Sequence, residues 1–341
     1  SALGYILSER HETFTFAETA DALSKAARAA PDAVLVGSSI LEDSGAEMVG
    51  VLARKLHQAG IIVVAGSTRS PLALAGLTVV VRRHVVGVAL LLTTLVGALL
   101  AAGLLARHHA EVPVLAAGVG GYLPGVAIPL VSDTLVAVML GVTSLTTLAT
   151  TVWLVLTGET RYRFFVPLVL LLMTGVYGAL LTGDLFNLYV GFEILLTASY
   201  VLLTMGGTAQ RIRAGITYVV VSVISSVVFL IAIAMVYAAT GTVNMADLAG
   251  KLGDLPTDVQ MVLHVMLLVG FAIKAAVFPL SFWLPDSYPT APAPVTAVFA
   301  GLLTKVGIYA IIRLETLLFP ASVISDLLLA AAGLSLLVGI L

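Results

Sequence analysis

The sequence predicts an all-α polytopic membrane bundle of about eight transmembrane helices, one of them broken, with a small soluble α/β segment at its N-terminus. Hydrophobic residues make up 60% of the 341 residues and charged residues only 11%, and the mean hydropathy is +1.10. Soluble proteins are about half apolar and a quarter charged. Of the 36 charged residues, 14 fall within residues 1–70 and 22 within the other 271. We therefore expect a soluble head followed by a membrane-embedded body.

Composition also excludes several classes of function. The net charge is −2 and the chain has no basic run, so no nucleic-acid partner is expected. The absence of cysteine removes disulfides, thiolate metal sites and iron–sulfur clusters. Metal-ligand spacing, a nucleophile elbow and a phosphate-binding loop are also missing. The sequence therefore predicts neither an enzyme nor a bound cofactor or metal.

The head, residues 1–70, alternates short apolar runs with helical patterns. Strands are expected at 13–16, 33–36 and 61–64, and helices at 17–30 and 47–58. The stretch ProAspAlaValLeuValGly with the acidic loop after it weakly resembles part of a response-regulator receiver domain. Gly37 stands where that family carries its phospho-accepting aspartate. We interpret the head as a soluble α/β appendage, receiver-like at most, without chemistry of its own.

Long apolar runs begin at Val85, and a helix needs about 20 residues to cross the hydrocarbon layer. The run at 71–81 is too short, and extending it back would bring Arg69 to mid-depth at a cost of about 2.5–3.5 kcal/mol. We interpret residues 71–84 as a remnant, re-entrant or interfacial piece, followed by the membrane domain at 85–341. Transmembrane helices are predicted at about 85–106, 128–156, 164–182, 185–206, 215–238, 257–283, 293–318 and 322–341.

Basic residues in short loops predict the orientation of the bundle, because cytoplasmic loops carry an excess of lysine and arginine. If the helices alternate, one side has Arg82, Arg83, Arg161, Arg163, Arg211 and Arg213, and the other has Arg107, Lys251 and Arg313. The first side is therefore expected to be cytoplasmic. The head lies on the same side unless residues 71–81 span the membrane.

Three ionisable residues fall at mid-depth in predicted helices, namely Glu193, Lys274 and Lys305. Such residues mark ion pathways by default, because each needs a partner, a water-filled cavity or a neutral state. The structural alternative is a static ion pair that only fixes helix packing. A buried pair rarely adds net stability, so we favour a functional role in an ion pathway for all three.

Other polar or irregular positions are weighed in the same way. Pro279 follows Lys274 by five residues and lacks an N–H for the Ala275 carbonyl, so it is expected to break the helix. Broken helices recur at transporter ion sites. His264 is a supporting residue: a packing histidine is the favoured interpretation, and a proton carrier is the alternative. Asp133 and Asp184 are expected to cap helix starts.

Three blocks make a family recognisable: GDLFNLYVGFEILLTASYVLLTMGG (183–207), TGTVNMADLAGKL (240–252) and IKAAVFPLSFWLPDSYPTAPAPVTAVFAGLLTKVGIYAIIR (273–313). They resemble the D subunit of Mrp-type multisubunit cation/proton antiporters, a relative of the proton-channel subunits of respiratory complex I. Ser281 and Tyr288 stand where complex I relatives often have histidines, which favours the Mrp branch. The resemblance implies that Glu193 is the family's mid-membrane glutamate, Lys274 the lysine of its broken helix and Lys305 the lysine of the next helix.

The resemblance also implies a function and partners. We expect a cell-membrane subunit of a monovalent cation/proton antiporter, with Na⁺ as the expected cation, in which a proton half-channel runs through Glu193, Lys274 and Lys305. Its partners would be protons, cations, lipid and the other subunits of the complex. Because family members have about fourteen helices, the chain is expected to be truncated at both ends. The alternatives are a proton-channel subunit of a complex I-like redox pump and a truncated scaffold that does not transport.

Overall fold

The computed structural model describes residues 33–37, 60–64, 71–80, 84–119, 127–158, 164–291, 293–320 and 324–340. The chain forms two compact units, Ser1–Arg82 and Arg83–Leu341.

The first unit contains a parallel pair of strands and a helix. Strand β1 (Ala33–Gly37) pairs with β2 (Gly60–Val64), with Leu35 opposite Ile62, which confirms the two strands predicted at 33–36 and 61–64. Helix α5 (Pro71–Val80) packs against β2. Its ten residues span about 15 Å, half the thickness of the hydrocarbon layer. The strand predicted at 13–16 and the helices predicted at 17–30 and 47–58 lie outside the described residues.

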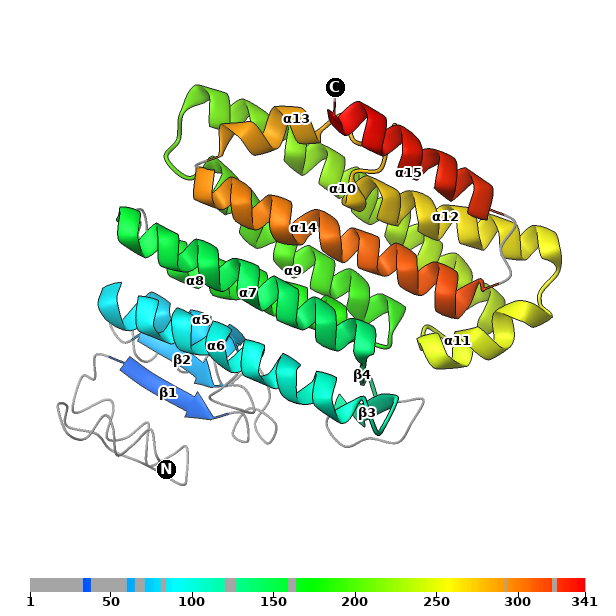
Figure 1. The fold of residues 1–341 in the computed structure, drawn as a ribbon, viewed down its shortest axis with the longest axis horizontal. Coiled ribbons are helices and arrows are strands. Elements are labelled where there is room, and N and C mark those ends of the chain that lie inside the picture. Colours follow the sequence, from blue (N-terminus) through cyan, green and yellow to red (C-terminus); the bar gives the residue numbers. More distant parts are fainter. Residues whose placement is uncertain are drawn as a thin grey trace. The chain divides into compact units, whose positions relative to one another are not determined.

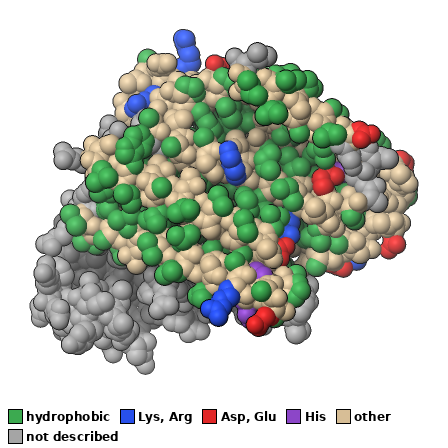
Figure 2. Space-filling model, viewed as in Figure 1, with side chains coloured by type: hydrophobic (Ala, Val, Ile, Leu, Met, Phe, Trp, Pro, Cys, Tyr) green, Lys and Arg blue, Asp and Glu red, His purple; other side chains and the backbone are tan. Residues whose placement is uncertain are grey.

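The second unit is a bundle of long apolar helices (Figure 1). In chain order these are α6 (His84–His108), α7 (Thr134–Thr157), α8 (Phe165–Leu181), α9 (Leu185–Thr204), α10 (Ala209–Thr240), α12 (Thr257–Ala275), α14 (Ala293–Arg313) and α15 (Ser325–Ile340). Among the described residues, six helices are long and apolar enough to cross a membrane, and α8 and α15 are shorter apolar helices. Figure 2 shows a face on which hydrophobic side chains dominate. The predicted membrane bundle is confirmed.

Hydrogen bonds between successive turns define two ends of this bundle. At one end the Gly183 N–H donates to the Pro129 carbonyl, and the Met245 N–H donates to the Gly183 carbonyl. We call it the hairpin end, since it also holds the β3–β4 hairpin described next and α11 (Met245–Lys251). At the opposite end the Arg211 guanidinium donates to the Thr290 carbonyl at 3.1 Å. The helices therefore alternate in direction, which is the arrangement that the comparison of basic residues assumed.

The hairpin corrects one predicted element. Strand β3 (Val114–Gly118) pairs antiparallel with β4 (Pro129–Asp133), so the helix expected from residue 128 begins only at Thr134. The Asp133 carboxylate accepts the Val136 N–H at 2.9 Å and caps α7 there. Asp184 caps α9 in the same way by accepting the Asn187 N–H at 2.8 Å. The predicted capping roles of both aspartates are confirmed.

Helices α8 and α9 approach closely because small residues face each other. A Cβ added at Gly175 would lie 2.5 Å from the Leu195 nitrogen, and one added at Gly191 would lie 2.9 Å from the Ala179 nitrogen. Small residues at such contacts let membrane helices pack backbone to backbone. This packing fixes α9, and with it the height of Glu193.

Helix α12 ends earlier than predicted. Residues 257–283 were expected to form one helix broken at Pro279, but α12 ends at Ala275. Ala276 takes the left-handed conformation with φ 55°, and the Val277 N–H donates to the Ala272 carbonyl at 3.0 Å. Together with the bond from the Ala276 N–H to the Ile273 carbonyl, this is a Schellman motif. The helix therefore ends in a C-terminal cap whose left-handed residue lies three residues before Pro279.

The segment after the break folds back onto the bundle. The Trp283 indole N–H donates to the Ile273 carbonyl at 3.2 Å, which gives this carbonyl in the last turn of α12 a second donor beside the Ala276 N–H. Short helical pieces follow at α13 (Leu284–Ser287) and η4 (Tyr288–Thr290). From α15, the Ser335 hydroxyl oxygen accepts the Phe278 N–H at 2.9 Å. Non-helical backbone is tolerated at membrane depth where protein surrounds it.

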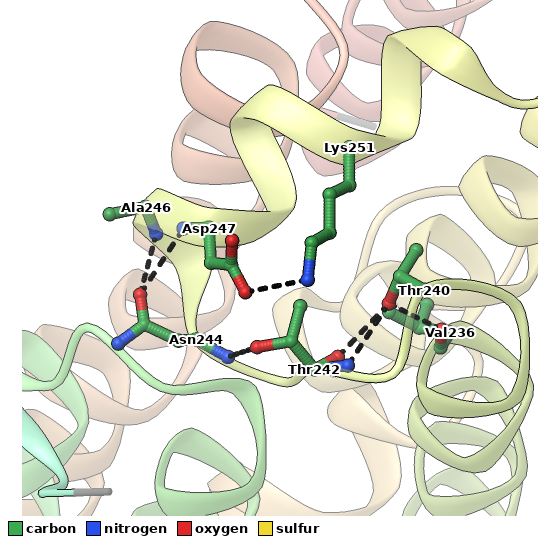
Figure 3. Close-up of polar contacts among 7 residues, drawn as sticks. All are labelled: Val236, Thr240, Thr242, Asn244, Ala246, Asp247 and Lys251. Carbon is green, nitrogen blue, oxygen red and sulfur yellow. Dashed lines mark hydrogen bonds and ion pairs between the residues drawn. The ribbon is translucent and has the colours of Figure 1, made fainter. Parts of the chain in front are cut away.

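The turn between α10 and α11 is closed by side-chain hydrogen bonds (Figure 3). The Asn244 side-chain oxygen accepts the N–H groups of Ala246 and Asp247 and caps α11. Lys251 then pairs with Asp247 at 3.0 Å, four residues apart on an exposed face. Both charges of α11 are thus engaged with each other.

Candidate functional site

Two of the predicted residues meet in the middle of the bundle. Glu193 comes from α9 and Lys274 from the last turn of α12, and Lys274 Nζ lies 3.8 Å from Glu193 Oε1. Ser226 of α10 connects them: Lys274 Nζ donates to Ser226 Oγ at 3.0 Å, and Ser226 Oγ donates to Glu193 Oε1. Three helices therefore contribute one group each to a continuous ammonium–hydroxyl–carboxylate cluster.

The two charges are unequally buried. The Lys274 side chain is 3% exposed and the Glu193 side chain 36% exposed. An ammonium without a partner is very costly in such a place, and Lys274 has the carboxylate, the hydroxyl and the Phe192 ring, whose centroid lies 5.1 Å from Nζ. A change at Glu193 should therefore act on Lys274 more strongly than the reverse.

Space for water adjoins this cluster. A cavity of about 20 Å³ touches Lys274, and its polar lining comes from Tyr218, Ser222 and Ser225. This volume is enough for one water molecule. Ser226, Ser222 and Tyr218 follow one another at four-residue spacing on one face of α10, toward the opposite end. The Tyr218 hydroxyl continues to Ser199 Oγ at 2.9 Å.

Lys305 is not joined to this cluster. Its side chain is exposed on α14, and its ammonium donates to the Ala300 carbonyl and, at 3.4 Å, to Thr304 Oγ1. Within the described part of the chain it makes no ion pair or hydrogen bond with Glu193 or Lys274. The Pro279 ring also lies outside the cluster, in the non-helical segment after α12.

His264 has a charged partner that sequence reasoning missed. Its Nε2 lies 2.6 Å from Oε1 of Glu315, which belongs to the π-helical turn η5 (Leu314–Leu318) after α14. The ring stacks on Phe319, with centroids 4.4 Å apart and an interplanar angle of 4°. Glu315 follows Arg313 closely, so in the sequence it resembled an ordinary charge at a helix end.

A second ion pair joins α7 to α14 at the hairpin end. Arg313 binds the Asp133 carboxylate with both nitrogens, at 2.6 and 2.7 Å. Burial alone would raise the pKa of the Asp133 carboxyl, but hydrogen bonds from Arg313 and the Val136 N–H outweigh it and hold this pKa below its ordinary value. Arg313 is thus committed to a structural partner.

Ser226 is the other residue that sequence reasoning missed. Serines recur along α10, so its identity alone carries no signal. Its position could have been found only by placing α10 between α9 and α12. Among the described residues, no group of three or more histidine, aspartate or glutamate side chains is placed to hold a metal ion.

Comparison with known proteins agrees with this geometry. Residues 182–341 match the family described as NADH:quinone oxidoreductase/Mrp antiporter, TM. The D subunit of the Na(+)/H(+) antiporter of Alkalihalophilus pseudofirmus is 49% identical over 189 residues, which are 54% of this chain and 38% of the relative. The D subunit of a probable K(+)/H(+) antiporter of Rhizobium meliloti is 47% identical over 195 residues, 56% of this chain and 36% of the relative.

A solved structure supports the same relationship. A chain of the Mrp complex from Dietzia sp. is similar with a TM-score of 0.69 at 39% identity, over 73% of this chain and 47% of that chain. The present chain thus spans less than half the length of these relatives. The resemblance to the D subunit of Mrp-type antiporters is thereby confirmed, and residues 182–341 are similar to the membrane domain described as NADH:quinone oxidoreductase/Mrp antiporter.

Proposed function

We propose that this chain is a membrane subunit of a monovalent cation/proton antiporter and carries a proton half-channel in which Glu193, Lys274 and Lys305 relay protons. One observation carries the proposal: the ammonium of a lysine side chain that is 3% exposed is bridged by a serine hydroxyl to a carboxylate inside a transmembrane bundle. Ionisable groups at this depth mark ion pathways by default.

The cluster can couple the position of a charge to the presence of a proton. While Glu193 is ionised and close, Lys274 holds its proton, because the carboxylate compensates the cost of burying the ammonium. If the carboxylate is neutralised or moves away, that cost acts unopposed and favours release of the proton. The Ser226 hydroxyl can accept a hydrogen bond from Lys274 and donate one to Glu193 at the same time, so it holds the two charged groups in a fixed relative position.

Protons are proposed to reach Lys274 from the opposite end. The cavity beside Lys274 and the hydroxyls of Ser222 and Tyr218 form a polar route in that direction, since they lie one and two turns from Ser226 along α10. One water molecule in the cavity would connect the ammonium to this route. The route is short and lies within described helices, so single substitutions can test it.

Lys305 is proposed as the next carrier after Lys274. It lies near the middle of the apolar span Val295–Leu318, where an exposed ammonium is costly in lipid. Such a charge needs polar surroundings from further polypeptide. The support for its role is the resemblance to the antiporter D subunit together with this placement.

The transported cation, the partners and the location are part of the same proposal. Relatives are named as subunits of Na(+)/H(+) and probable K(+)/H(+) antiporters, and we propose Na⁺ as the principal cation. Other subunits of a complex are proposed as partners because the similar chain of known structure comes from an Mrp complex. We place the protein in the cell membrane, with the opposite end, which carries Arg211 and Arg213, in the cytoplasm.

The test is cation/proton exchange by the assembled complex in vesicles, with Na⁺ or K⁺ added. Lys274→Arg keeps the charge but arginine does not release its proton, so exchange should be abolished while assembly is intact, and Glu193→Gln should have the same result. Lys251→Arg is the matched control, because Lys251 is also paired with a carboxylate but is exposed. Normal turnover in Lys274→Arg would leave Lys274 only an electrostatic role.

The family description favours one alternative, a proton-channel subunit of a complex I-like redox pump, since it also includes NADH:quinone oxidoreductase. In such a pump the cluster of Glu193, Ser226 and Lys274 would carry protons in the same way. Purification of the native complex separates the two: flavin or iron–sulfur subunits would identify the redox pump, and their absence together with cation-dependent proton exchange would identify the antiporter.

A further inference from the structure

The pair formed by His264 and Glu315 is a second buried titratable site in the bundle. It lies toward the hairpin end, ten residues before Lys274 on α12, which corresponds to about 15 Å along the helix. The His264 side chain is 4% exposed and the Glu315 side chain 19% exposed. His264 is thus enclosed by protein, and Glu315 is partly accessible from outside the bundle.

The π-helical turn η5 builds the surroundings of the imidazole. The Phe319 N–H donates to the Leu314 carbonyl at 2.9 Å, five residues back. Both the carboxylate of Glu315 and the stacked ring of Phe319 come from this turn or its end. Isolated π turns often occur at functional sites. Here the turn brings a carboxylate and an aromatic plane to the same histidine.

Other charged groups on the elements around His264 either pair with other residues or are exposed. Arg313, just before η5, is bound by Asp133. The two charges of α11 pair with each other (Figure 3). On α12 itself, Asp258 is exposed in the first turn, and the half of α10 at 225–240 carries no charged residue. Within the described chain, Glu315 is therefore the charged group bonded to His264.

We propose that His264 and Glu315 form a proton-binding site that serves the hairpin end of the bundle. The proton enters from water at that end through the more exposed Glu315 carboxylate. It then passes to the imidazole: the Oε1–H bond breaks, the Nε2–H bond forms, and an imidazolium–carboxylate pair results. The reverse transfer returns it. Imidazole is suited to this because its charge changes within the physiological pH range.

This inference deepens the proposed function, on which its transport test rests. The cluster at Glu193, Ser226 and Lys274 serves the opposite end through the hydroxyls of α10. A site at His264 and Glu315 would give the bundle a second proton station on the other side of Lys274. The alternative is a purely structural role, in which the hydrogen bond between His264 and Glu315 acts as a latch that only holds η5 against α12.

Transport by the assembled complex distinguishes a proton site from a latch. Glutamine at His264 can still bond to Glu315 but does not titrate, so His264→Gln should lower exchange at least tenfold and change its pH profile, and Glu315→Gln should do the same. The controls are His108→Gln and Glu111→Gln, exposed groups near the hairpin, which should stay within twofold of the unmodified complex. An unchanged rate and pH profile in His264→Gln would overturn the proposal in favour of the latch.

A second measurement needs no substitution and no transport. Infrared spectra of the complex, recorded across pH 5 to 9 with isotope-labelled histidine and glutamate, should show one imidazole gaining a proton and the stretching bands of one buried carboxylate shifting with it at a single midpoint. Absence of this coupled change would overturn the proposal even if the variants fail to assemble. If Lys274→Arg proved fully active, the proposed relay would fail while this result would stand independently.

Discussion

Gly307 of α14 lies directly against the last residue of α12, Ala275. A Cβ added at Gly307 would lie 2.6 Å from the Ala275 nitrogen and 2.8 Å from its Cα. Contacts this short with backbone atoms require one of the two helices to move. Gly307 has no side chain, and this leaves room for the end of α12. The position of Lys274, the residue before Ala275, therefore depends on glycine at position 307.

The first prediction is that Gly307→Ala disturbs the site. Alanine favours a helix over glycine by about 0.5–1 kcal/mol, but overpacking here should cost about 1–3 kcal/mol and displace the end of α12. We expect a lower melting temperature of the detergent-solubilised protein and slower exchange. Gly178→Ala is the control, because nothing lies within 4 Å of its added Cβ. A Gly307→Ala protein as stable and active as that control would contradict the close approach.

The second prediction concerns the serine that bridges the cluster. Ser226→Ala removes a hydrogen bond to each of two charged groups, and such bonds contribute about 1.5–3 kcal/mol. We expect slower exchange and a lower melting temperature, because Lys274 keeps only the carboxylate 3.8 Å away and the Phe192 ring. Ser144→Ala, in α7, removes a bond to the neutral Tyr177 hydroxyl, so exchange should change little. Equal exchange in the two variants would mean that the bridge has no part in transport.

The charged members of the cluster could be predicted from the sequence, while the serine could not. Glu193 and Lys274 stand out because an ionisable side chain in an apolar helix is rare and costly. A serine at the same depth is ordinary, and only the three-dimensional placement of α10 distinguishes Ser226 from Ser222 and Ser225. Composition and periodicity similarly predicted the helices well, because a bilayer demands long apolar runs.

Local hydrogen bonding decided the features that the sequence did not predict. Residues 128–133 were predicted as the start of a transmembrane helix, yet residues 129–133 pair with β3. The Asp133 cap then sets the start of α7. The break after Lys274 depends on a left-handed alanine, a position where glycine would have been the usual signal. Pro279, which has no N–H for the Ala275 carbonyl, predicted a break nearby, and α12 ends at Ala275.

A third prediction tests the Asp133–Arg313 pair. Asp133→Asn keeps a side chain that can cap α7 but loses the ionic hydrogen bonds, so the free energy of unfolding at pH 7 should fall by about 1–3 kcal/mol. The pKa of Asp133 is lowered in the folded protein, so its stabilisation is fully present above the ordinary carboxyl value of about 4 and is lost below it.

The difference in melting temperature between the unmodified protein and Asp133→Asn should therefore be constant near neutral pH and shrink as the pH falls below about 4. Asp247→Asn is the control, since Asp247 pairs with Lys251 on an exposed face, and such pairs contribute little. A difference that grows on acidification would contradict the sign of the Asp133 shift.

A fourth prediction concerns orientation. The chain has no cysteine, so single cysteines report sidedness directly. Ala209→Cys is exposed at the opposite end and Ala110→Cys at the hairpin end. A membrane-impermeant thiol reagent should label Ala209→Cys only from the cytoplasm and Ala110→Cys only from outside, and a tag on Ser1 should be accessible from the cytoplasm. Labelling of the two cysteines from the reverse sides would invert the orientation derived from the arginines.

The last prediction tests the helix end that presents Lys274. Ala276 has φ 55°, a conformation that costs an L-residue about 1–2 kcal/mol and glycine almost nothing. Ala276→Gly should therefore stabilise the protein, by about 0.5–1 kcal/mol once the greater freedom of glycine in the unfolded chain is counted. Ala276→Val should destabilise it, because a β-branched side chain fits a positive φ poorly.

If the Schellman cap sets the break, Pro279→Ala should leave α12 ending at Ala275, and a cysteine at Ala276 should react with a small water-soluble thiol reagent at the same rate with or without Pro279. Slower reaction in Pro279→Ala would mean that the proline, and not the cap, keeps the segment after Lys274 out of the helix.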